Sequence, residues 1–260
     1  MKDAKQGSAG RAGLFVTCLV DTLRPKVGFA AVELLESAGY EVVVPSQGCC
    51  GQLNYNNGDT RGAAEMALKA ARDFAEVDYV VVPSGSCAAT IVKHYPEMFP
   101  SGSAEHAEVL SLANKTYELT VFLHEIAASA PVEVTPQEDS DSAGGSTLAY
   151  HDGCSGLREL GIFHQPRALL ESLPGVAVAE GMNPETCCGF GGTFCVRYPE
   201  VSANIADKKC AEVIATEADC LVSGDLGCLL NIEGRLNRRG EPVKALHVAE
   251  VLAAKKGGSR

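Results

Sequence analysis

Eleven cysteines occur in this chain, and eight of them follow a pattern that is present twice. In each copy a single cysteine precedes an adjacent Cys-Cys-Gly, and a fourth cysteine follows at a similar distance. Matching cysteines are 136, 138 and 141 residues apart (154 − 18, 187 − 49 and 228 − 87). The first set comprises Cys18, Cys49, Cys50 and Cys87, and the second comprises Cys154, Cys187, Cys188 and Cys228. Because thiolate is a soft ligand, the repetition predicts two thiolate-rich metal sites.

The spacing within each set argues against a structural zinc site. Such sites usually contain cysteines separated by roughly two to four residues, and no two cysteines of this chain are spaced in that way. An adjacent pair of cysteines is cramped for one tetrahedral ion but can serve two iron atoms of one cluster. The glycine after the pair lets the backbone approach the cluster and donate N–H bonds to sulfur. The odd number of cysteines excludes a complete disulfide framework, which a reducing cytosol also disfavours.

Short β-branched stretches that lead to the cysteines alternate with longer amphipathic stretches. The expected strands and the loops that follow them lie at 13–18, 41–51, 78–87, 147–154, 176–189 and 219–228. The expected helices lie at 26–38, 60–76, 158–172 and 199–217. This order predicts an α/β fold of two duplicated, Rossmann-like βαβαβ halves, each with a mostly parallel sheet. Sites in such sheets form at the carboxyl ends of the strands, so the three cysteine loops of each half are expected to converge there.

The chain of 260 residues is long enough for two such halves, each with its own core. We expect a first half at 11–130 and a second half at 147–254. The stretch between them, 131–146, is acidic and rich in Pro, Gly and Ser, which is typical of a linker. The first ten residues and 255–260 are expected to be frayed ends.

Composition excludes several classes of protein. The net charge is −11, from 22 basic and 33 acidic side chains, which argues against nucleic-acid binding. No apolar run reaches the roughly 18 residues that a membrane span needs. Residues 14–20 resemble a secretion signal, but the run is short, no cleavage site follows it, and it matches the strand at 147–154. We therefore expect a cytoplasmic protein.

Four stretches carry a resemblance that extends beyond the cysteines. They are PSQGCCGQLNYNNGD (45–59), HDGCSGLRELG (151–161), CCGFGGTFCVRYPEVS (187–202) and SGDLGCLLNIEGRL (223–236). Over nearly its whole length the chain resembles the lactate utilization protein A family of cysteine-rich CCG-domain proteins. That family is related to the CCG-domain component of heterodisulfide reductase.

This resemblance implies an iron–sulfur oxidoreductase component of a system that converts L-lactate to pyruvate. Such a system pairs it with a second, ferredoxin-like iron–sulfur protein and a third component. The resemblance also implies that the eight cysteines are the cluster ligands, for two [4Fe-4S] clusters of cubane or noncubane form. No stretch resembles a flavin or nicotinamide site, since GFGG at 189–192 is too short and wrongly placed for a dinucleotide fingerprint. No catalytic residue is assigned.

One departure from the related reductase concerns the last element of each set. The reductase has Cys-x-x-Cys there, whereas this chain has Ser84 and Asp225 at the first position. Both are weaker candidate ligands, and both are alternatively loop or cap residues. Cys195 is a third weaker candidate, because it follows Cys188 by seven positions and could approach the second cluster. Alternatively, it is a small buried thiol.

Of five further residues, three allow two interpretations each. His151 could donate to cluster sulfur or move a proton, or it could be satisfied by backbone at a strand end. Arg158 and Arg197 could bind a carboxylate or an acidic partner, although exposed helix arginines are the simpler interpretation. Cys210 and Cys220 are expected to be core thiols.

Three functions remain open on the sequence. The first is an electron-transferring subunit of a lactate-oxidising complex, because lactate oxidation needs a hydride acceptor that this chain does not provide by itself. The second is an independent thiol or heterodisulfide reductase, which the missing fifth cysteines disfavour. The third is a non-enzymatic zinc or thiol scaffold, which the absence of zinc knuckles disfavours.

Overall fold

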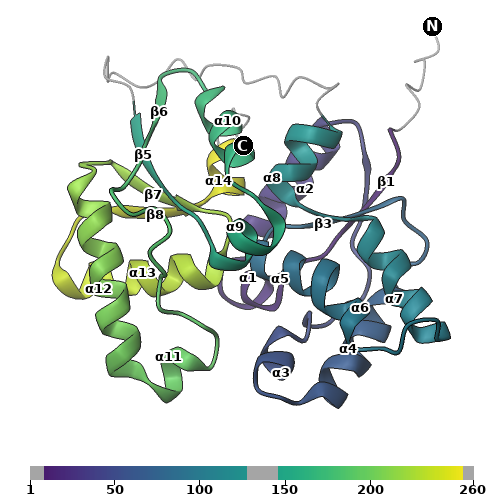
Figure 1. Cartoon of the computed structure of the whole chain (residues 1–260). Coiled ribbons are helices and arrows are strands. Elements are labelled where there is room, and N and C mark those ends of the chain that lie inside the picture. The colour runs from purple at the N-terminus through teal and green to yellow at the C-terminus, as the bar shows by residue number, and fades with distance from the viewer. Residues whose placement is uncertain (1–8, 128–145, 254–260) are drawn as a thin grey trace, which may run out of the picture.

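The computed structural model describes residues 9–127 and 146–253, which form two α/β halves side by side (Figure 1). Each half holds a four-stranded sheet in which every pairing is parallel. The strand order is β2-β1-β3-β4 in the first half and β6-β5-β7-β8 in the second, so the two orders correspond. The predicted duplication of an α/β half with a parallel sheet is therefore confirmed.

The strands are short and follow the apolar runs of the sequence. In the first half they are β1 (Arg11–Leu14), β2 (Glu41–Val43), β3 (Tyr79–Val82) and β4 (Thr116–Glu118). In the second they are β5 (Ser146–His151), β6 (Val176–Ala179), β7 (Cys220–Ser223) and β8 (Lys244–His247). The central strand β7 is buried throughout, as expected for a parallel sheet that is covered on both faces.

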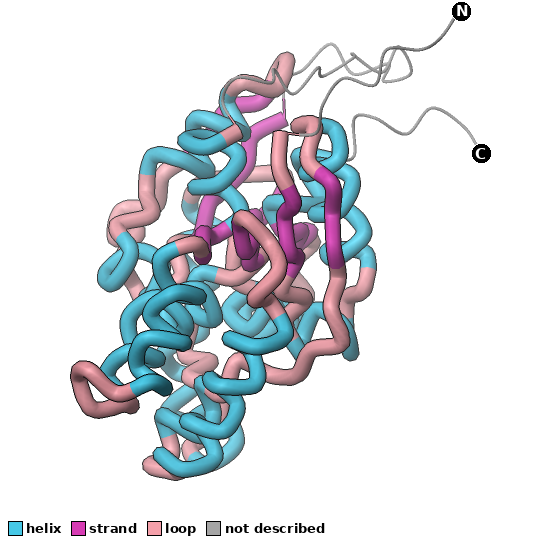
Figure 2. The backbone as a smooth tube through the Cα atoms, turned by 90° about the vertical axis from the view of Figure 1, so that its right-hand side faces the viewer, coloured by secondary structure: helices cyan, strands magenta, loops and turns pink. Residues whose placement is uncertain are grey.

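Helices follow each strand and cover the sheets, as the side view in Figure 2 shows. Those of the first half are α1 (Cys18–Leu23), α2 (Lys26–Ser37), α3 (Gln52–Asn56), α4 (Thr60–Asp73), α5 (Gly85–Ala89), the π-helix η1 (Thr90–His94), α6 (Tyr95–Glu97), α7 (Ala104–Asn114), α8 (Leu119–Val121) and the π-helix η2 (Phe122–Ile126). Those of the second half are α9 (Cys154–Leu160), α10 (His164–Glu171), α11 (Phe194–Arg197), α12 (Pro199–Ala215), α13 (Leu226–Arg239) and α14 (Val248–Ala253).

Three local expectations differ from the structure. The helix expected at 158–172 is two helices, α9 and α10, because Gly161 ends the first one in the left-handed conformation. The strand expected at 13–18 ends earlier, and Cys18 begins α1 instead. Each half also has a fourth strand, β4 or β8, that the βαβαβ pattern did not include.

The largest apolar core joins the two halves. It contains residues of β1 and α2 together with residues of β5, β7, α13 and α14, whereas a second core lies mostly within the first half. Across the junction α14 packs on α2, and α10 packs on α8 and η2. The halves therefore share buried surface and are not separate bodies on a tether.

The expected linker lies outside the described residues except for Ser146, which begins β5, and the expected frayed ends lie almost wholly outside them. In the two described stretches, no helix combines the length and the apolar character that crossing a membrane requires.

Candidate functional site

Helix starts position two of the four thiols in the first half. Cys18 is the first residue of α1, directly after β1, and Thr17 caps that helix by accepting a bond from the Val20 N–H at 3.4 Å. Cys87 lies in the first turn of α5, after β3, where the Ser84 hydroxyl accepts its N–H at 3.3 Å. Each capped helix therefore holds its cysteine at the carboxyl end of a strand.

The adjacent pair lies in the loop between β2 and α3. Gly51 follows it with φ of +77°, a left-handed conformation that a residue with a Cβ rarely adopts, and its N–H points to the Cys49 Sγ at 3.5 Å. The buried Tyr95 hydroxyl donates to the Cys50 carbonyl oxygen at 2.8 Å. The loop is thus fixed from both sides.

The four thiols of the first half touch in one series. Cys18 and Cys49 Sγ are 3.7 Å apart, and Cys50 and Cys87 Sγ are 3.3 Å apart. The hydrogen bond between Cys18 and Cys49 lowers the pKa of Cys49 and raises that of Cys18. The lowered pKa of Cys49 favours its thiolate, the form that binds metal.

The second half repeats this arrangement. Cys154 begins α9 after β5, and Cys228 lies in the first turn of α13 after β7. The pair between them receives two backbone bonds: the Gly189 N–H reaches Cys187 Sγ at 3.3 Å, and the Phe190 N–H reaches Cys188 Sγ at 3.4 Å. The four thiols again form a hydrogen-bonded series, and the bond from Cys154 lowers the pKa of Cys187.

The residues present fit an iron–sulfur cluster in each half. Every cysteine is a free thiol, so none of the eight is consumed by a disulfide. Each set offers four soft sulfur donors at one sheet edge, together with backbone N–H groups aimed at sulfur. Four thiolates with N–H···S bonds are the protein contribution that such clusters require.

A cavity of about 330 Å³ lies beside the first-half thiols at the junction of the halves. All four thiols of that half line it, and the second half contributes residues that include Phe190, Thr193 and Cys195. The Thr193 hydroxyl also donates to Asn57 Oδ1 at 3.0 Å, next to α3. The loop after the second Cys-Cys-Gly therefore forms part of the wall of the first site.

The three weaker ligand candidates have these positions. Ser84 caps α5, and Asp225 reaches across the junction, where its Oδ2 accepts the Ser86 N–H at 2.9 Å. The Ser84 hydroxyl is 3.5 Å from the same oxygen. Cys195 lines the first-half cavity, whereas the sequence made it a weaker candidate for the second cluster. Ligation by any of the three stays a prediction.

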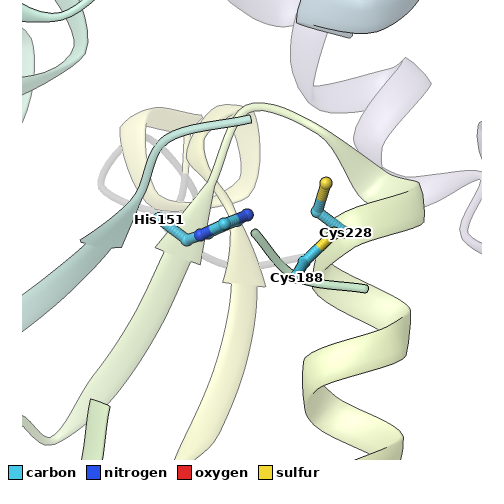
Figure 3. Close-up of side chains that lie close together, drawn as sticks. All are labelled: His151, Cys188 and Cys228. Carbon is cyan, nitrogen blue, oxygen red and sulfur yellow. The ribbon is translucent and has the colours of Figure 1, made fainter. Parts of the chain in front are cut away.

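His151, at the end of β5, lies against the second set of thiols (Figure 3). One of its ring nitrogens and the Sγ atoms of Cys188 and Cys228 all lie within 4.8 Å of one another. Neither ring nitrogen has a hydrogen-bond partner among the described residues, so the backbone does not satisfy this histidine there. Burial, followed by the charge of Lys209, lowers the pKa of His151 to about 3.

The other sequence-based expectations concern two arginines and two cysteines outside both thiol sets. Arg158 is exposed and pairs with Glu185 at 3.9 Å, and Arg197 is exposed. Cys210 and Cys220 are buried in the main core, where their thiols were expected.

Two groups of buried ionisable side chains near the sites were not predicted from the sequence. Glu118, at the end of β4, accepts the N–H groups of Thr120 and Val121, and burial raises its pKa to about 7. Arg167 on α10 forms two bonds of 2.8 and 2.9 Å to Asp152, next to His151. Arg167 and Asp152 are distant in sequence, and the partners of Glu118 follow a strand that the sequence did not predict. No local sequence pattern therefore indicated either group.

Comparisons with known proteins agree with this geometry. The family described as "Cysteine-rich domain" (CCG) matches twice, at residues 12–92 and 148–233. The chain is 44% identical to "Lactate utilization protein A" of Geobacillus kaustophilus over 94% of this chain and 99% of that protein. It is 40% identical to "Lactate utilization protein A 2" of Bacillus cereus over 94% of this chain and 98% of that protein.

Among solved structures, a hypothetical protein from Helicobacter pylori has a similar fold, with a TM-score of 0.66 at 10% identity. The similarity covers 98% of this chain and half of that protein's length. It bears on the fold alone, and it shows that the two-half arrangement occurs within a longer chain.

Proposed function

Because the chain belongs to the lactate utilization protein A family, we propose that it is the iron–sulfur electron-transfer component of an L-lactate oxidation system. The observation that carries this proposal is the pair of matched four-thiol sets, each with N–H groups aimed at sulfur. A cluster bound by such a set accepts and releases single electrons at a potential that its hydrogen bonds tune.

The chain's own residues bind and tune the clusters in this proposal. Cys18, Cys49, Cys50 and Cys87 hold one [4Fe-4S] cluster, and Cys154, Cys187, Cys188 and Cys228 hold the other. The adjacent pair would supply two of the four thiolates in each half. The glycine after each pair keeps the backbone close enough to donate to sulfur.

Lactate itself is oxidised elsewhere in the system. Lactate is a carboxylate, and the described residues that line the first-half cavity include no lysine or arginine to hold one. The cavity includes Asp225 instead, a carboxyl group that offers a carboxylate substrate no positive charge. We therefore propose that the chain passes electrons between partners, namely a ferredoxin-like iron–sulfur protein and a third component. We place the system in the cytoplasm, where thiols stay reduced.

The first test is the iron and acid-labile sulfide content of protein purified without oxygen, with its visible and EPR spectra. Two clusters correspond to about eight iron and eight sulfide per chain. Cys50→Ser and Cys188→Ser should each remove the iron of one half, and Cys210→Ser, which changes a core thiol outside both sets, should remove none. Stoichiometric zinc, or no metal after reconstitution with iron and sulfide, would overturn the proposal in favour of a thiol scaffold.

The cavity favours a second candidate function, an independent thiol or heterodisulfide reductase. Its wall brings Cys195 to the same space as the four thiols of the first half, and much of the rest of the wall is apolar. A disulfide substrate could reach sulfur there without a partner protein. Reduction of a small disulfide by an artificial electron donor, with no partner added, would favour this candidate over the relay.

A further inference from the structure

The two thiol sets differ at one buried position. His151 lies three residues before Cys154 (154 − 151), and Phe15 lies three residues before Cys18 (18 − 15). Phe15 is buried and stacks on Phe74 with 5.4 Å between ring centroids. The duplicated fold thus places an apolar ring beside the first set and an imidazole beside the second.

The imidazole of His151 has no structural role that accounts for it. Only 1% of the residue is exposed, and neither ring nitrogen has a hydrogen-bond partner among the described residues. A buried polar group without a partner costs about 1–3 kcal/mol. Phenylalanine at the matching position shows that the fold accepts an apolar ring there. A group that binds the nitrogen would offset this cost.

The geometry directs the nitrogen toward sulfur ligands. Figure 3 shows the ring extending from β5 toward Cys188, with Cys228 beside it at the start of α13. The nitrogen and the two Sγ atoms lie within 4.8 Å of one another, a spacing that donors around one metal centre can adopt. A neutral imidazole nitrogen is a common metal ligand in proteins.

Asp225, the oxygen candidate of this half, is engaged elsewhere. Its Oδ2 accepts the Ser86 N–H at 2.9 Å across the junction, and it lines the cavity of the first site. His151 is therefore the better-placed donor besides the four thiols.

We propose that His151 is a nitrogen ligand of the iron–sulfur cluster held by Cys154, Cys187, Cys188 and Cys228. The proposal rests on the iron–sulfur function proposed above and extends it, because the two centres of the chain then differ in their ligands. The first is held by sulfur alone, next to Phe15, and the second by sulfur and one imidazole.

The test is pulsed EPR of the reduced protein, prepared without oxygen from cells that are supplied with ¹⁴N- or ¹⁵N-histidine. We expect a nitrogen coupling of the strength that a directly bonded ligand gives, and we expect it to change with the histidine isotope. This measurement uses the unaltered chain, so it does not depend on whether a variant folds.

Two variants identify the histidine that gives the nitrogen coupling. His151→Phe installs the residue of the first half, and the coupling should disappear while the signal of the first centre stays. His106→Phe, on α7 of the first half, is the control and should leave the coupling unchanged. Iron in both halves with only weak nitrogen couplings, or a strong coupling that persists in His151→Phe, would overturn the ligand assignment and leave the electron-transfer function standing. A chain without iron would overturn both.

Discussion

The glycines that follow the two cysteine pairs allow a matched test of how tightly each loop is held. Gly51 and Gly189 have φ of +77° and +82°, so alanine at either position pays the left-handed penalty of about 1–2 kcal/mol. The gain from a stiffer unfolded chain, about 0.4–1 kcal/mol, is common to both and cancels in the comparison. The difference between the two variants therefore reports the surroundings alone.

Those surroundings differ. A Cβ on Gly189 would lie 2.6 Å from the Ser202 backbone oxygen, which α12 holds in place, and 3.2 Å from the Ile205 Cβ. A Cβ on Gly51 would lie 3.3 Å from the Met66 Cβ, and a shift of a few tenths of an ångström relieves a contact of that length. Overpacking against a fixed group costs about 1–3 kcal/mol. We therefore expect Gly51→Ala to destabilise the protein by about 1–2 kcal/mol and Gly189→Ala by about 1–3 kcal/mol more.

The assay is urea unfolding followed by circular dichroism, since the chain has no tryptophan, on protein kept without oxygen. Iron content measured on the same samples should fall more in Gly189→Ala, because the displaced loop carries the N–H that donates to Cys187. Equal losses of unfolding free energy in the two variants would refute the reasoning, as would a larger loss in Gly51→Ala.

Three further changes test the buried polar groups. Burial raises the pKa of Glu118 to about 7, so the folded chain holds a proton that the unfolded chain releases near its ordinary value. That stabilisation is complete below about pH 4.5 and is lost as pH rises through 7. Between pH 4.5 and 8 the unfolding free energy should therefore fall by about 3 kcal/mol more in the unaltered chain than in Glu118→Gln. Parallel curves of unfolding free energy against pH would contradict this. Asp225→Ala leaves the Ser86 N–H without its acceptor and should cost about 1–3 kcal/mol in urea unfolding, with an unchanged midpoint as the contrary result. Arg167→Met leaves the buried Asp152 carboxylate unpaired and should cost about 3–5 kcal/mol in the same assay, and a loss under 1 kcal/mol would show that water already reaches the carboxylate.

The fold was predictable where apolar runs and cysteines repeat together. The strands before Cys18, Cys87 and Cys228 could be found because β-branched residues lead to a chemically marked end. The fourth strands could not be found in that way. β4 is three residues long and contains Glu118, and β8 alternates exposed and buried residues at the edge of its sheet. Neither has the continuous apolar run that marks a buried parallel strand.

The candidate site was predictable only within each half. The convergence of Cys154, Cys188 and Cys228 follows from strand ends that share one sheet edge, whatever the other half does. The position of Cys195 depends on how the halves pack, because its loop lines the cavity of the opposite half. The reach of Asp225 to Ser86 depends on the same packing. Sequence spacing contains no information about a junction between copies.

The junction itself has an evolutionary consequence. The helix after the last strand of each half packs on the helix that follows the first cysteine of the other half: α14 on α2, and α8 with η2 on α10. In a two-fold symmetric homodimer, each subunit contacts the other through the same surface patch. Two identical ancestral chains could therefore have associated through these contacts before their genes were fused. A homodimer must carry the same residue beside both thiol sets, whereas a fused chain can keep Phe15 at one and His151 at the other. In a single chain the surroundings of the two thiol sets are therefore free to differ.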